Sequence, residues 1–95
     1  MSGGEMVELR FRLFGACRCL APEGAVAFPA PVGASAGDVR RLLVAVLDRG
    51  GAGPDGQALV MRSALADDRH LLGEEWTVPP SATLELAVLP PVCGG

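Results

Sequence analysis

The sequence predicts an α+β fold in which one main helix packs on one face of a mixed sheet. Three observations predict it: alternating apolar residues near the N-terminus, one amphipathic helical segment in the middle, and a second alternating segment near the C-terminus. A chain of 95 residues has enough apolar side chains for one modest core, so we expect one small domain. The expected order is strand, strand, helix, strand, short strand, strand.

The first two elements are predicted to be strands. Residues 7–13 alternate apolar and charged side chains, which is typical of a strand with one apolar face. Gly15 is expected to end this strand, and a loop leads to a second strand at 25–32. Because Pro29 and Pro31 cannot donate to a ladder of hydrogen bonds, the second strand is expected at a sheet edge.

The main helix is predicted to begin after Ser35. Ser35 is a typical N-cap residue, and Asp38 takes the place of the glutamate of a capping box. Gly50 and Gly51 are expected to end the helix. Between them, apolar residues recur with the spacing of an amphipathic helix: Val39, Leu42, Leu43, Val46 and Leu47.

The segment after the helix is predicted to be loop and short strands. Residues 50–57 are rich in glycine and are expected to form a flexible loop. Without a Gly-Lys-Ser/Thr sequence this loop is not a phosphate-binding cradle, so we expect the chain to bind no nucleotide itself. A short strand is expected at 58–62, and the mixed segment 63–75 is expected to include another at Leu71 and Leu72.

The final strand is predicted at 83–89, after a turn that contains Pro79 and Pro80. Trp76 and Val78, just before that turn, are expected to cover an open end of the core. The strand places apolar side chains on one face at alternate positions: Leu84, Leu86 and Val88.

Charge and hydropathy argue against several classes of partner. The net charge is −3 and the arginines are dispersed among acidic residues, whereas nucleic-acid binding needs clustered positive charge. No apolar stretch has the length of a membrane span, and the N-terminus lacks the basic and apolar regions of a secretory signal. We therefore expect no nucleic-acid or membrane partner and a cytoplasmic location.

The cysteines and the histidine are expected to have ordinary structural roles. Cys17, Cys19 and Cys93 do not make a disulfide framework, and no second cysteine pair or histidine cluster completes a metal site. Cys17 and Cys19 are expected to be small residues near a strand end. His70, the only histidine, is expected to be a surface or partly buried residue, so no metal ligand is predicted.

The end of the chain carries the candidate chemistry. Residues 90–95 are Pro-Pro-Val-Cys-Gly-Gly. The two prolines favour an extended backbone, and the two glycines are costly to order. We therefore expect an extended arm, roughly 20 Å long, whose tip is slim enough to enter a narrow tunnel in a partner enzyme. The reactive group is expected to be the α-carboxylate of Gly95.

This tail, placed after a strand, resembles the small subunit of molybdopterin synthase and, more broadly, the ubiquitin-like sulfur carriers that include the thiamine sulfur carrier. The resemblance covers 84–95 best and extends to 7–15 and to the segment after Ser35. It implies a ubiquitin-like β-grasp domain over 1–89, with 1–5 disordered. Such a domain has a mixed sheet of four to five strands, the first and last parallel at its centre, and the main helix on one face.

The resemblance also implies how the tail would be used. An ATP-dependent, ubiquitin-activating-type adenylyltransferase would adenylate Gly95, and a sulfur donor such as a cysteine desulfurase or a rhodanese would convert the adenylate to a thiocarboxylate. Val92, Cys93 and Gly94 would enter the partner's active site, for instance in the large subunit of molybdopterin synthase. The chain itself would supply no catalytic side chain, bind no cofactor and not be an enzyme.

A docking surface is expected at the root of the tail. If the first and last strands are parallel neighbours, Phe14 and Leu89 lie together on the sheet face away from the helix. With Pro90 and Pro91 they would form a surface that binds partners. The alternative is that 63–75 covers Phe14 and Leu89.

Three functions remain in competition. The first is a thiocarboxylate sulfur carrier, with molybdopterin synthesis as the leading pathway and thiamine, cysteine, tRNA thiolation or a secondary metabolite as alternatives. The second is a ubiquitin-like modifier that joins Gly95 to other proteins. The third is a non-covalent interaction module, which the Gly-Gly end argues against. Cys93 stands where the family usually has a small hydroxyl residue, so the pathway stays open.

Overall fold

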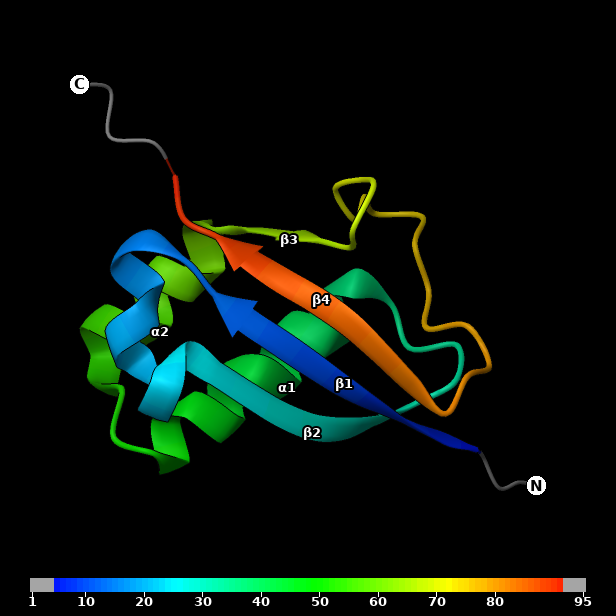
Figure 1. Ribbon diagram of the computed structural model, residues 1–95, viewed down its shortest axis with the longest axis horizontal. Helices are drawn as coiled ribbons and strands as arrows, with labels where there is room; N and C mark the ends of the chain where they lie inside the picture. Colours follow the sequence, from blue (N-terminus) through cyan, green and yellow to red (C-terminus); the bar gives the residue numbers. More distant parts are fainter. Residues whose placement is uncertain (1–4, 92–95) are drawn as a thin grey trace.

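The computed structural model describes residues 5–91 of the chain (Figure 1). In Figure 1 the sheet lies in front of the main helix, and the order of its strands is β2-β1-β4-β3. The strands are β1 (Met6–Leu13), β2 (Ala25–Pro31), β3 (Ala64–Ala66) and β4 (Thr83–Leu89). The helices are α1 (Ala36–Arg49), α2 (Gly53–Arg62) and two short 3-10 segments, η1 (Gly15–Leu20) and η2 (Pro22–Gly24).

The two central strands, β1 and β4, are parallel. Their register runs from Glu8 opposite Thr83 to Leu13 opposite Val88. Just past β1, the backbone N–H of Phe14 donates to the carbonyl of Val88 at 3.3 Å, which continues the pairing. The carboxyl ends of β1 and β4 therefore lie together, as predicted, and the chain leaves β4 beside the residues that follow β1.

The core lies between the sheet and α1. Every second side chain of β1 is buried, which confirms the predicted phase of this strand. Phe11 of β1 stacks on Phe28 of β2 with ring centroids 5.8 Å apart. Burying an apolar side chain of this size stabilises the fold by about 1.5–3 kcal/mol relative to leaving it exposed. The helix contributes buried residues one or two turns apart: Val39, Leu43 and Leu47.

The start of α1 is the predicted capping box. The backbone N–H of Asp38 donates to Ser35 Oγ at 3.1 Å, and the backbone N–H of Ser35 donates to the Asp38 carboxylate at 3.3 Å. Arg41 also donates to this carboxylate, and that bond, followed by those with Ser35, lowers the pKa of Asp38. Because the folded-state pKa is lowered, this stabilisation is present at neutral pH and is lost as the pH falls through the pKa of folded Asp38.

The segment after α1 differs from the prediction. Residues 58–62, predicted as a strand, form the second half of α2, and the predicted loop 50–57 is helical from Gly53 onward. Gly56 and Val60 are the buried residues of this helix, and their spacing of four is helical. The apolar run was too short for its period to separate strand from helix.

Two further contacts explain why α2 is stable as a helix. Pro54 lies in its first turn, where a backbone N–H would have no partner within the helix, so the N–H that proline lacks is not missed. At its other end the guanidinium of Arg40, from α1, donates to the carbonyls of Val60 and Ser63 at 2.9 and 2.6 Å. The carbonyl of Val60 also accepts the N–H of Ser63 at 3.1 Å, so Arg40 gives that carbonyl a second hydrogen bond and ties the C-terminal end of α2 to α1.

The strand on the outer side of β4 comes later in the sequence than the strand predicted at 58–62. It is β3, which pairs antiparallel with β4 so that Leu65 lies opposite Val88. The predicted strand at Leu71 and Leu72 was wrong, because Leu71 makes only an isolated bridge with Ala66. The irregular segment that follows β3 runs beside β4 to the start of that strand (Figure 1).

The end of this segment packs in the core, and the first described residue of the chain is hydrogen-bonded beside the sheet. Val78 is buried in the core and Trp76 packs against it, as predicted. The carbonyl of Glu5 accepts a hydrogen bond from the N–H of Val32 at 3.0 Å. The other residues predicted to be disordered, 1–4, lie outside the described part of the chain.

Candidate functional site at the root of the tail

The chain leaves β4 against the turn that follows β1. Gly15, the first residue of η1, has a φ of +54°. A Cβ placed on Gly15 would lie 2.9 Å from Cγ of Pro90, so the proline ring lies directly on the Gly15 backbone. Figure 1 shows the end of β4 passing this turn. Pro90 is partly buried and Pro91 is exposed.

The predicted reactive residue and the residues predicted to enter a partner lie beyond this point. Val92, Cys93, Gly94 and Gly95 are outside the described residues, which end at Pro91. The residues just before them, Leu89, Pro90 and Pro91, are described, and we call them the root of the tail. That root is at the edge of the sheet face that α1 does not cover.

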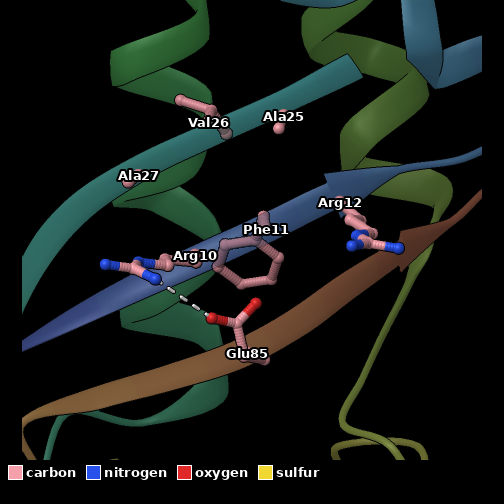
Figure 2. Close-up of a pocket in the computed structure, with 7 residues that line it drawn as sticks. All are labelled: Arg10, Phe11, Arg12, Ala25, Val26, Ala27 and Glu85. Atoms are coloured by element: carbon pink, nitrogen blue, oxygen red, sulfur yellow. Dashed lines mark hydrogen bonds and ion pairs between the residues drawn. The ribbon is translucent and has the colours of Figure 1, made fainter. Parts of the chain in front are cut away.

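The uncovered sheet face presents two arginines from β1. Arg10 lies opposite Ala27 of β2 and Glu85 of β4, and Arg12 lies one pair further toward the tail root, opposite Ala25. Because the alanines are small, the arginines border a shallow hollow of about 520 Å³. Figure 2 shows Arg10 directed toward Glu85, with Arg12 further along β1.

The two arginines differ in their partners. Arg10 is within 3.5 Å of the Glu8 carboxylate and 3.4 Å of the Glu85 carboxylate. Arg12 makes no ion pair with any residue in the range 5–91. It also borders two further hollows beside Phe14. Arg12 was not among the site residues predicted from the sequence, although its even position in the alternating strand places it on the same face as Phe14.

Phe14 and Leu89 occupy the predicted face. Each lies one residue beyond a buried residue of its strand, Leu13 or Val88, and therefore points away from α1. Phe14 is 43% exposed, whereas Leu89 is partly buried and pairs with Ala64 of β3. The alternative that 63–75 covers them holds only in part, because much of Phe14 stays in contact with solvent.

The part of 63–75 that approaches Phe14 is acidic. Asp67 and Asp68 border the same hollow as Phe14. The backbone N–H groups of Arg69 and His70 donate to the Asp67 carboxylate at 2.8 and 2.6 Å, and these bonds lower the pKa of Asp67. Asp67 therefore keeps its negative charge at neutral pH, and the hollow beside Phe14 is lined by acidic residues as well as by Arg12.

Cys17 and Cys19 both belong to η1 and are free thiols. Cys17 is buried, with Sγ 3.6 Å from Oγ of Ser63, and packs in the core as a small residue. Cys19 is exposed. His70 is exposed as well, with Nδ1 3.9 Å from Asp67. Across 5–91, no group of three or more histidine, cysteine, aspartate or glutamate side chains is placed to hold a metal ion.

The strand order, the parallel central pair and the helix on one face define a ubiquitin-like β-grasp fold, as predicted. The structure is similar to the crystal structure of SAMP1 from Haloferax volcanii, with a TM-score of 0.64 and 24% sequence identity. The matched region covers 93% of this chain and 99% of SAMP1. No protein-family model matches the chain, and no curated protein matches its sequence. Within 5–91, none of the helices has the length and hydropathy that crossing a membrane requires.

Proposed function

We propose that this protein is a ubiquitin-like sulfur carrier that serves molybdenum cofactor biosynthesis. The observation that carries the proposal is the position of Pro90, which lies at one end of a β-grasp sheet on the backbone of Gly15, next in sequence to the exposed Phe14. Pro90 is also the first residue of the Pro-Pro-Val-Cys-Gly-Gly sequence. The folded surface then lies next to the residue at which the tail sequence begins. An enzyme that binds the surface is in a position to receive the arm.

The chemistry takes place at the carboxylate of Gly95. A carboxylate is a poor electrophile, and transfer of AMP from ATP gives it a good leaving group while pyrophosphate departs. The outer sulfur of a persulfide on a donor such as a cysteine desulfurase or a rhodanese then attacks the acyl carbon, and AMP leaves. A thiol reductant cleaves the S–S bond of the resulting acyl disulfide and forms a disulfide with the donor's cysteine, so that Gly95 keeps a thiocarboxylate. This chain contributes recognition and positioning, and the partners bind ATP and supply the catalytic side chains.

The proposed partners use the tail root in succession. A ubiquitin-activating-type adenylyltransferase docks on Phe14, Leu89, Pro90 and Pro91 and takes the last residues of the tail, 92–95, into its active site. The large subunit of molybdopterin synthase then docks on the same surface and accepts the sulfur. Because these reactions use cytoplasmic ATP, we place the carrier in the cytoplasm.

The proposal predicts a specific mass for the protein isolated from its native host. Intact-mass measurement should show a fraction in which one sulfur replaces one oxygen, and alkylation of the thiocarboxylate should label Gly95. The control is the same protein from a host strain that lacks the activating enzyme, where this fraction should vanish. If Gly95 is instead found joined to lysines of other proteins and no sulfur form exists, the chain is a modifier and the carrier function is wrong.

A second prediction concerns the residue before the two glycines. Cys93→Ser should accept and deliver sulfur at rates close to those of the wild type, because a glycyl thiocarboxylate already stores the sulfur and serine has nearly the same size. The yield of thiocarboxylate and the formation of product are measured separately. Normal adenylation followed by a block in sulfur loading would show that the Cys93 thiol takes part in a relay.

A further inference from the structure

We propose that Gly15 is a positioning residue, which seats the ring of Pro90 and thereby sets the direction in which the tail leaves the sheet. The inference rests on the proposed function, since it concerns how Gly95 reaches the activating enzyme. It starts from two independent features of Gly15: a φ of +54°, and the 2.9 Å that would separate an added Cβ from Cγ of Pro90.

Pro90 needs this packing contact with Gly15 because hydrogen bonds of the sheet cannot fix its position. The ladder of hydrogen bonds ends at Leu89, and a proline has no N–H with which to continue it. The pyrrolidine ring fixes φ of Pro90 and restricts Leu89 to extended conformations. The position of the ring on Gly15 therefore determines the path of the backbone that follows. Pro91, the next residue, is exposed.

The direction of that path matters because the reactive group is far from the seat. Five residues of extended chain from Pro90 to Gly95 span roughly 17 Å. A rotation of about 10° at Pro90 would move the end of such an arm by about 3 Å, and an error of about 1 Å in the placement of a reacting group is enough to lower a rate about 100-fold. The contact between Pro90 and Gly15 thus sets the direction in which the carboxylate is presented, while Phe14 and Leu89 bind the partner.

An added methyl group at residue 15 would act in two ways, through backbone strain at positive φ and through displacement of the Pro90 ring. The chain offers a control that separates them. Gly33 has a φ of +90°, and beyond its two chain neighbours no described atom lies within 4 Å of where its Cβ would be, so Gly33→Ala adds the strain without displacing another segment. Gly51, with a φ of +98° and equally open surroundings, is a second control of the same kind.

The test uses ATP–pyrophosphate exchange with the adenylyltransferase of the native host, together with the affinity of the carrier for that enzyme without ATP. Gly15→Ala should lower the exchange rate at saturating carrier at least tenfold while the affinity changes less than the rate. Gly33→Ala should lose similar stability and keep the wild-type rate. Pro90→Ala removes the ring, so adding it to Gly15→Ala should restore part of the lost rate.

The outcomes separate this inference from the proposed function. If wild-type protein supports no exchange, the proposed function is wrong and the positioning role falls with it. Normal exchange by wild type together with equal rates for Gly15→Ala and Gly33→Ala would overturn the inference alone. If Gly15→Ala does not fold, Pro90→Ala by itself decides, because it should slow exchange with little change in unfolding temperature. An unchanged rate for that variant would contradict the seat.

Discussion

Adding one alanine after Gly95, or deleting Gly95, is expected to abolish adenylation and to leave folding unchanged. The reactive group in the proposed chemistry is the carboxylate at the tip, and either change moves it by about 3.5 Å, one residue of extended chain. A displacement of that size removes the carboxylate from a site built for in-line attack on ATP. The buried core that the structure describes ends at Val88, so the fold does not depend on the tip.

The measurement is ATP–pyrophosphate exchange with the adenylyltransferase, accompanied by thermal unfolding of each variant. An alanine inserted after Met1 serves as the matched control, because it lengthens the chain equally and is expected to change neither quantity. Exchange that persists at the wild-type rate with the extended tail would rule out the Gly95 carboxylate as the reactive group.

The parts of the fold that the sequence predicted are those with a long or redundant signal. The alternation of apolar and charged residues in β1 runs without a break over 7–13, and the capping box of α1 is marked by Ser35, Asp38 and two turns of apolar periodicity after them. The parallel pairing of β1 with β4 came from the family resemblance, since nothing in the pattern of one strand specifies its neighbour.

The errors fall where the signal was short. Residues 58–62 contain a brief apolar run that suits a strand as well as a helix, and Arg40, which caps the helix that forms there, is distant in sequence. With α2 in that place, the pairing with β4 passes to Ala64–Ala66, where alanines give little strand propensity of their own.

The sheet face of Phe14 and Leu89 was predicted, whereas the contacts beside them were missed for a similar reason. Phe14 and Leu89 follow from strand phase once the two strands are neighbours. The contact between Gly15 and Pro90 joins residues from opposite ends of the chain, and glycine at that position reads in the sequence only as the end of a strand. Arg12 reads as one of several dispersed arginines, and only the sheet places it beside Phe14.

Leu89→Arg is expected to weaken binding to the adenylyltransferase, and to the large subunit of molybdopterin synthase, by about tenfold or more. Leu89 lies on the uncovered sheet face at the root of the tail, as Phe14 does. The substitution removes an apolar contact from the centre of the proposed interface. It also adds a second unpaired guanidinium near Arg12, which must be desolvated when the partner binds.

The affinity is measured by isothermal titration calorimetry, and far-ultraviolet circular dichroism checks that the variant is folded. The matched control is Met6→Arg. Met6 is 55% exposed on the same face of β1 but at the opposite end of that strand, so it receives the same change of charge and hydropathy far from the tail. Because the two variants carry the same net charge, a non-specific electrostatic effect would weaken both equally, whereas docking at the tail root weakens only Leu89→Arg. A folded Leu89→Arg variant with wild-type affinity would remove Leu89 from the interface and leave Phe14 and the two prolines to account for it.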